Sequence, residues 1–137
     1  MIPRGAKIYL DKSYVKIYYD SSTCILTSIW KGFTTFDEIK EISKRILEAI
    51  SIERACKVMY DTSQLEPLDQ ESADFISTDF TQQMKKAGVK YSAAVIPKDE
   101  FAKSSMDEIQ KTQISNSNNA LYFTSMSKAL RWLKKQI

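Results

Sequence analysis

The segment that decides the fold is "TTFDEIKEISKRILEAI", residues 34 to 50, together with "ACKVMYD", residues 55 to 61. Thr35 lies three residues before Glu38, which is the spacing of a capping box at the start of a helix. Isoleucines then follow at steps of three, four and four, at Ile39, Ile42, Ile46 and Ile50. This spacing predicts a helix with one buried stripe, and the short apolar run after it predicts a strand.

The predicted strand at 55–61 contains two adjacent apolar residues, Val58 and Met59. Successive side chains of a strand point to opposite faces, so adjacent apolar residues indicate a strand that is covered on both faces. A helix that leads into such a strand is typical of the crossover units of a parallel sheet.

The rest of the chain continues this alternation of strands and helices. Residues 7–20 and 24–30 are extended and rich in Tyr, Ile and Val, and the turn-forming residues between them predict an antiparallel hairpin. The remaining elements are expected as a helix at 70–87 ended by Gly88, a strand at 89–97, a helix within 99–109, a strand at 120–123 and a last helix capped near Ser125.

The predicted order of elements is therefore ββαβαβαβα, in one domain that spans residues 1–137. It indicates an α/β fold: a mixed sheet of about five strands, with an N-terminal antiparallel hairpin and about four helices. In open sheets of this kind, ligands and partners bind beyond the carboxyl ends of the strands. The segment "KVMYDTSQLEPLDQES", residues 57 to 72, is expected at such a position.

The composition excludes several kinds of chemistry. The chain has no histidine, so Ser-His-Asp or Cys-His catalytic groups and imidazole-ligated zinc sites cannot form within it. With three glycines in all, neither a GxGxxG turn nor a GxxxxGK phosphate loop is present. A dispersed net charge of +3 is too small to indicate a nucleic-acid surface. No apolar run reaches the length of a membrane span, so a cytoplasmic location is the default expectation.

The two cysteines, Cys24 and Cys56, each fall inside an apolar run. Buried thiols usually behave as small hydrophobic side chains. We expect that role for both cysteines, in preference to a redox or nucleophilic one.

Four segments of the chain, taken in order, carry a family resemblance. They are "IWKGFTTFDEI" at 29–39, "VMYDTS" at 58–63, "GVKYSAAVIP" at 88–97 and "LYFTSMSKALRWL" at 121–133. Their order and spacing resemble STAS domains, the sulphate-transporter and anti-sigma-factor antagonist family, and particularly the small stand-alone SpoIIAA-like proteins of bacteria. The resemblance covers nearly the whole chain and implies a non-catalytic protein-interaction or regulatory module with no cofactor and no metal.

One loop decides what the resemblance implies about regulation. In phospho-regulated members, a strand ending near Asp-x-Ser is followed by Asp-Ser-Ser-Gly at the start of the next helix, and a partner kinase phosphorylates the first serine of that pair. Asp61 and Ser63 match the strand end, Asp69 matches the motif aspartate, and Gln70 and Glu71 occupy the serine pair. The usual phosphorylatable serine is therefore missing.

The resemblance places a partner-binding surface on this loop and the helix start after it. Its expected members are Asp61, Thr62, Ser63, Asp69, Gln70 and Glu71. Asp69 is also expected to cap the helix, and Glu71 to complement the positive end of the helix dipole. Thr62, Ser63 and Ser72 remain candidate phosphate acceptors.

Other readings of the same residues stay open. Asp61, Glu66 and Asp69 would suit Mg²⁺ or Ca²⁺ in an enzyme, although no compact ligand loop is present. Phenylalanines and tryptophans at helical spacing could line a pocket for a lipid or another small ligand, although such residues are more often core. These are Phe33, Phe36, Phe75, Phe80, Phe101 and Trp132.

Two surface features would also allow contacts with other chains. Trp30 and Phe33 flank Gly32, and an exposed aromatic patch there would mark an interaction site. An exposed edge strand can pair with a second copy of the chain, so a homodimer is consistent with the tyrosine-rich N-terminal edge. Those tyrosines are Tyr9, Tyr14, Tyr18 and Tyr19.

Overall fold

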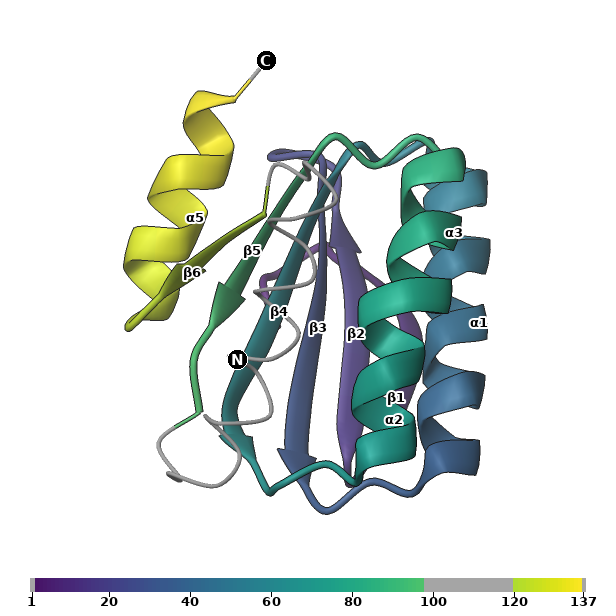
Figure 1. The fold of residues 1–137 in the computed structure, drawn as a ribbon. Helices are drawn as coiled ribbons and strands as arrows, with labels where there is room; N and C mark the ends of the chain where they lie inside the picture. The colour runs from purple at the N-terminus through teal and green to yellow at the C-terminus, as the bar shows by residue number, and fades with distance from the viewer. Residues whose placement is uncertain (1, 98–119, 137) are drawn as a thin grey trace.

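The computed structural model describes residues 2–97 and 120–136 of the chain, which form one mixed sheet with helices on both faces (Figure 1). The elements are β1 (Lys7–Lys12), β2 (Val15–Asp20), β3 (Ile25–Gly32), α1 (Phe36–Glu53), β4 (Lys57–Leu65), α2 (Gln70–Phe75), the π-helical turn η1 (Ile76–Phe80), α3 (Thr81–Lys86), β5 (Tyr91–Val95), β6 (Ala120–Phe123) and α5 (Met126–Lys135). The helix expected within 99–109 lies outside the described residues.

The sheet has six strands in the order β1-β2-β3-β4-β5-β6, one more than the sequence predicted. The extended stretch 7–20 turns at Ser13 and Tyr14, so that Lys12 pairs with Val15 and the stretch forms two antiparallel strands. A two-residue connection is the shortest common hairpin loop, and these two residues carry no strong turn signal. The first three strands are antiparallel, and β3 to β6 are parallel.

This extra strand changes which residues lie at the edge of the sheet. β1 is the edge strand, and β2 is paired on both sides, so Tyr18 and Tyr19 of β2 do not lie on an open edge. Ile8 of β1 is exposed. Pairing of this edge with a second copy of the chain stays a prediction.

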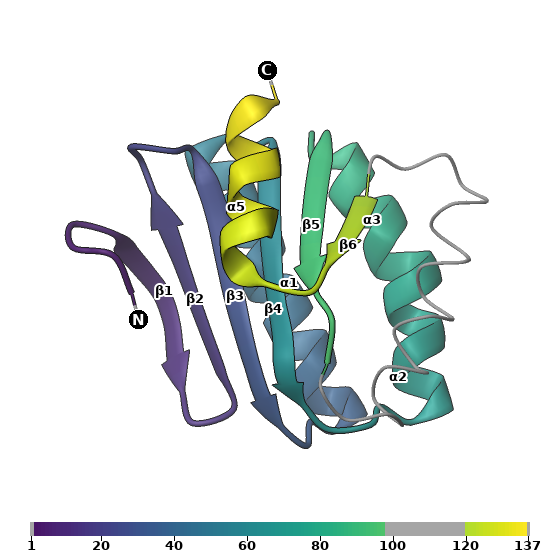
Figure 2. The ribbon, with the colours of Figure 1, turned by 90° about the vertical axis from the view of Figure 1, so that its left-hand side faces the viewer.

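The helices cover the two faces of the sheet unequally. Figures 1 and 2 show α1, α2 and α3 on one face and α5 on the other. On the first face Leu26, Val58 and Ile46 belong to the larger core cluster, and on the second Met59 packs in a cluster with Leu133. The opposite placement of Val58 and Met59 confirms that β4 is buried on both faces. Among the described residues, no helix is long and apolar enough to cross a bilayer.

Helix α1 begins and packs as its sequence predicts. The Thr35 hydroxyl accepts a hydrogen bond from the Glu38 amide, and the Glu38 carboxylate accepts one from the Thr35 amide. This capping box satisfies two amides that the first helical turn would leave unpaired. The isoleucine stripe is fully buried, and burial of each such side chain stabilises the fold by about 1.5–3 kcal/mol.

The second helix is interrupted where the sequence predicted one regular helix over 70–87. Helical backbone runs from α2 through η1 into α3, and in η1 the chain makes one wider, π-helical turn. The Thr81 hydroxyl donates to the Ile76 carbonyl at 2.7 Å within this turn. Helix-like spacing of apolar residues does not distinguish a π turn from an α turn, which is why the sequence did not show it. Gly88, with φ +106°, ends the helix as expected.

Several aromatic residues that could have lined a pocket lie in the core. Phe80 is buried edge-on to Tyr60, with ring centroids 6.5 Å apart. Trp132 of α5 packs against Tyr91 and Phe123. Phe101 lies outside the described residues.

Candidate functional site

The candidate site lies where β3 and β4 end and where α1 and α2 begin, at the lower side of Figure 1. At this point Gly32 pairs with Leu65, and the amide of Glu66 donates to the Gly32 carbonyl at 2.9 Å. Gly32 has φ +73°, a conformation that residues with a Cβ rarely adopt, and it turns the chain toward α1. We call this end of the sheet, with Phe33, Glu66, Asp69, Gln70 and Glu71, the carboxyl edge.

The first part of the predicted binding loop is not a loop. β4 continues to Leu65, so Asp61, Thr62 and Ser63 lie within the strand. Asp61 is held locally, because its carboxylate accepts hydrogen bonds from the Ser63 amide at 3.1 Å and from the Ser63 hydroxyl at 2.7 Å. Thr62 is 4% exposed and its hydroxyl donates to the Val95 carbonyl. The prediction that Thr62 faces a partner is therefore wrong: this hydroxyl joins β4 to the end of β5.

The second part of the predicted site is a helix start, as expected. Asp69 has extended backbone, and its carboxylate accepts a hydrogen bond from the Ser72 amide at 2.7 Å, which confirms it as the cap of α2. Gln70 is exposed, and its side-chain amide donates to the Asp74 carboxylate one turn later at 2.9 Å. Glu71 is exposed in the first turn, where a negative charge is favourable beside the helix dipole.

The structure divides the six predicted residues into two groups. Asp61 shares a strand face with Met59, whose cluster contains α5 residues, because side chains two apart lie on the same face. Asp69, Gln70 and Glu71 begin a helix that packs on the opposite face. A single partner surface therefore includes the helix start more readily than the strand residues.

The hydroxyl groups near this edge differ in accessibility. Ser72 is fully buried, and within the described part of the chain its hydroxyl has no hydrogen-bond partner. The hydroxyl of Thr34, just before the cap of α1, is also buried and has no hydrogen-bond partner among the described residues. Ser63 is half-buried, and its hydroxyl already donates to Asp61. A kinase would reach Ser63 before Ser72 or Thr62.

The aromatic patch predicted at Trp30 and Phe33 is half wrong. Trp30 is 5% exposed in the larger core cluster, and its indole N–H donates to the Ser28 hydroxyl at 2.9 Å. β3 pairs with β2 in a continuous register up to Trp30, so the alternation of the strand turns Trp30 inward, although the register with β4 shifts between Ile29 and Lys31. Phe33 follows the end of the strand and is 56% exposed. The apolar surface here thus comes from Phe33.

The carboxyl edge carries a negative charge. Carboxylates in the first turn of α1, after β4 and at the start of α2 are Asp37, Glu38, Glu66, Asp69, Glu71 and Asp74. Lys31 and Lys40 are the cations in the same segments, and the Lys40 ammonium lies 5.3 Å from the centre of the Phe36 ring. Phe36 in turn contacts Phe75 edge-on, which joins the start of α1 to the end of α2. In the described part of the chain, no three Cys, Asp or Glu residues are grouped so as to hold a metal ion.

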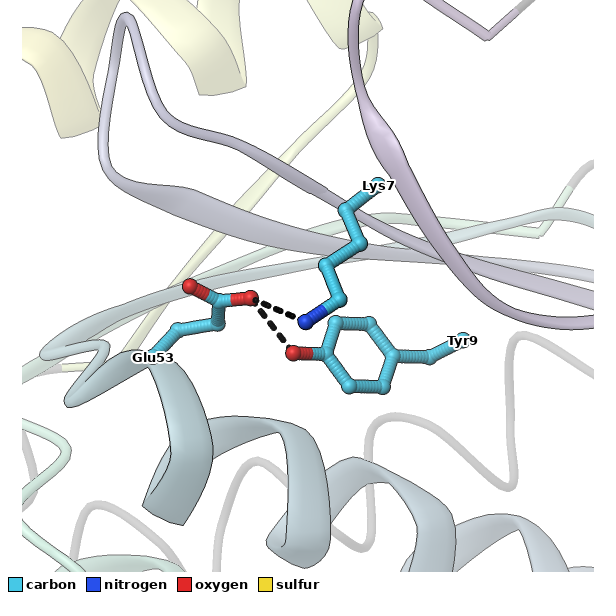
Figure 3. Close-up of polar contacts among 3 residues, drawn as sticks. All are labelled: Lys7, Tyr9 and Glu53. Carbon is cyan, nitrogen blue, oxygen red and sulfur yellow. Dashed lines mark hydrogen bonds and ion pairs between the residues drawn. The ribbon is translucent and has the colours of Figure 1, made fainter.

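A second polar cluster at the opposite end of the sheet was not predicted. Figure 3 shows Lys7 and Tyr9 of β1 pointing to Glu53, the last residue of α1. The Tyr9 hydroxyl donates to the Glu53 carboxylate at 2.5 Å, and the Lys7 ammonium lies 3.5 Å from the same oxygen. Burial and this hydrogen bond raise the pKa of Tyr9. The partners are more than forty residues apart, so no local sequence pattern signals the contact.

The cysteines lie near this second cluster, and one of them differs from expectation. Cys24 is exposed and Cys56 is half-buried, so the prediction of a buried thiol is wrong for Cys24. Cys24 ends the turn between β2 and β3 with φ +60°, and this left-handed conformation places it outside the strand. We call this end of the sheet, with Lys7, Tyr9, Tyr19, Cys24, Glu53 and Cys56, the amino edge.

Comparison with known proteins identifies the fold. No family model and no curated protein matches this sequence. Among solved structures, a Thermotoga maritima protein assigned as an anti-sigma factor antagonist superposes with a TM-score of 0.63 at 13% identity, over 87% of this chain and 93% of that one. The chain has a SpoIIAA-like fold. SpoIIAA itself, in its unphosphorylated form, matches with a TM-score of 0.56 at 8% identity, over 96% of this chain and 100% of its own.

A third match extends the comparison beyond anti-sigma factor antagonists. An uncharacterised Shewanella loihica PV-4 protein with a SpoIIAA-like fold superposes with a TM-score of 0.51 at 18% identity, over 94% of this chain and 92% of that one. The resemblance predicted from the sequence is therefore confirmed at the level of the fold. At these identities, the shared fold does not carry a function from one chain to the other.

Proposed function

We propose that this protein is a non-catalytic regulatory module that binds a protein partner through the carboxyl edge. The observation that carries the proposal is the exposed start of α2, where Gln70 and Glu71 lie on a helix capped by Asp69. The anti-sigma factor antagonists among the structural matches support a regulatory role for this fold. The proposed surface contains Phe33, Glu66, Gln70 and Glu71, with Asp61 and Ser63 at its margin.

The chemistry of this surface indicates the kind of partner. An exposed phenylalanine beside several carboxylates suits a partner that presents an apolar residue surrounded by lysines or arginines. The aromatic ring would supply buried area, and the carboxylates would orient the partner and speed its approach. Rim charges of this type make association weaker at high ionic strength.

We also propose that residue 70, the position that the family resemblance implies for phosphorylation, is not phosphorylated in this protein. Gln70 has no hydroxyl, and its amide is already bonded to Asp74. Glu71 carries a constant negative charge, but one carboxylate has less charge and fewer acceptor oxygens than a phosphate. Binding at this edge would then not be switched by a kinase acting at residue 70. Phosphate found on Ser63 in protein from the native host would instead indicate a displaced switch.

Affinity capture from the native host tests the partner surface. The edge variant combines Glu66→Gln, Glu71→Gln and Phe33→Ser, which leaves the Asp69 cap intact. The matched control combines Glu41→Gln and Glu48→Gln, which change exposed carboxylates on the outer side of α1. We expect a protein captured by wild type and by the control to be lost at least tenfold with the edge variant. Equal capture by all three proteins, with equal melting temperatures, would reject this surface.

A further inference from the structure

The amino edge contains two thiols, each directly before one of two neighbouring strands. Ile25 of β3 pairs with Lys57 of β4 in the parallel register, so Cys24 and Cys56 each come one residue before a matched pair. Neighbouring strands lie about 4.8 Å apart, and a disulfide requires Cα atoms about 4.4–6.8 Å apart. The register thus brings the two cysteine backbones into the range that a disulfide spans.

The Tyr19 phenol relates the two thiols to one face of the sheet. Cys56 comes directly before β4 and precedes Val58 by two residues, and Val58 belongs to the cluster packed under α1. Tyr19 of β2 belongs to the same cluster.

The Tyr19 phenol lies near the two thiols. Burial raises its pKa to about 12, and the next contributions are a hydrogen bond with the Cys24 thiol and the nearby charges that Cys24, Glu53 and Cys56 can carry. Tyr19 therefore contacts the Cys24 thiol and lies within range of the charges of Glu53 and Cys56.

Both thiols are accessible, but unequally. Cys24 is exposed at the end of the β2–β3 turn, where its thiol also donates weakly to the Ser21 carbonyl at 3.7 Å. Cys56 is half-buried at the junction of α1 and β4, where its carbonyl accepts hydrogen bonds from the Lys90 and Tyr91 amides. An oxidant from solvent would meet Cys24 first, with Cys56 behind it as the second thiol.

We propose that Cys24 and Cys56 are a peroxide-oxidisable pair that closes an intramolecular disulfide across β3 and β4. The Cys24 thiolate attacks hydrogen peroxide: an S–O bond forms, the O–O bond breaks, and the displaced hydroxide takes up the proton that the thiol had released and leaves as water. The Cys56 thiolate then attacks the resulting sulfenic acid: the S–S bond forms, the S–O bond breaks, and the displaced hydroxide takes up the proton that the Cys56 thiol had released and leaves as the second water. Two electrons pass from the two sulfurs to the peroxide. The product ties the β2–β3 turn to the end of α1.

Thiol trapping after oxidation tests the pair. The reduced protein is treated with hydrogen peroxide, denatured, and alkylated with N-ethylmaleimide. We expect the intact mass to fall by two hydrogens with no maleimide added, and a digest without reductant to contain the peptide joining Cys24 to Cys56. If both cysteines still take up maleimide after a peroxide treatment that fully oxidises free cysteine in solution, the proposal is overturned. A disulfide between two chains, or Cys24 oxidised to the sulfinic acid with Cys56 still alkylated, would do the same.

The variants Cys24→Ser and Cys56→Ser separate a bridge from general oxidation. Cys24 is exposed, so Cys24→Ser removes no buried apolar contact, and this variant should fold normally. Oxidised wild type should melt roughly 5–15 °C above the reduced protein, because the bridge restricts the unfolded chain. Peroxide should not raise the melting temperature of either variant. A rise in Cys24→Ser equal to that of wild type would overturn the assignment of the stabilised species to this disulfide.

Discussion

The carboxyl and amino edges of the sheet are both rich in polar groups, but the contacts at the two edges join different parts of the chain. At the carboxyl edge the backbones of Gly32 and Glu66 pair, but the side-chain hydrogen bonds are local: Asp69 bonds to Ser72 and Gln70 to Asp74, within four residues. At the amino edge, Tyr9 bonds to Glu53 across the whole of the hairpin, β3 and α1. Local contacts build a surface and leave its charges free to meet a partner. Contacts between distant segments hold the hairpin to α1.

The largest expected loss of stability comes from Trp30, at the point where the core ends at the carboxyl edge. Trp30→Ala removes a buried side chain and should lower the free energy of unfolding by about 3–5 kcal/mol. Phe33→Ala, three residues later, changes an exposed ring and should alter it by less than about 0.5 kcal/mol. Urea denaturation of both variants measures the difference. Equal effects would mean that Phe33 also belongs to the core.

The amino edge should be the more sensitive of the two to alkali. The pKa of Tyr19 is raised to about 12 in the folded state, so above pH 10 the unfolded chain loses this proton more readily than the folded chain. Stability is therefore complete below pH 10 and falls as the pH rises toward 12, by roughly 1–3 kcal/mol from this residue.

Tyr19→Phe isolates that contribution. Chemical denaturation at pH 8, 10 and 11.5 should show a shallower loss for the variant than for wild type. The loss will not vanish, because burial also raises the pKa of Tyr60 and Tyr18. Parallel curves for the two proteins would show that Tyr19 does not take part.

The cap of α2 should contribute a smaller, local effect. Asp69→Ala removes the acceptor of the Ser72 amide and should cost about 1 kcal/mol. Asp69→Asn keeps an oxygen at the same place and should cost much less. Thermal melting of the pair separates the cap from the charge, and a cost for Asn equal to that for Ala would show that the charge alone matters.

The smallest effect concerns the ionic part of the amino edge. Glu53→Gln keeps an acceptor for the Tyr9 hydroxyl and removes the ion pair with Lys7, whose side chain is largely exposed. We expect a loss of less than about 1 kcal/mol that shrinks further at 1 M salt. Glu48→Gln, in an exposed pair with Arg45, is the control and should show almost no change. A larger loss that is insensitive to salt would assign Glu53 a buried structural role.

The same difference between local and distant contacts decided what could be predicted from the sequence. The capped helix α1, the two-faced strand β4 and the Asp69 cap all leave local patterns, and they were predicted. The split of residues 7–20 at Ser13 and the extension of β4 through Thr62 were missed, because pairing with neighbouring strands decides both. The inward position of Trp30 and the cluster around Glu53 were missed because they depend on tertiary packing.

The π-helical turn at Ile76–Phe80 bears on how this chain tolerates changes in length. A π turn holds one residue more than the α turn that it replaces. Deleting one residue within 76–80 would return the segment to an ordinary α-helix, with Asp69 still at its start and Gly88 still at its end. A deletion within α1 would rotate half of its isoleucine stripe out of the core. The second helix can therefore lose a residue where the first cannot, and its outer surface can be reshaped without moving the sheet.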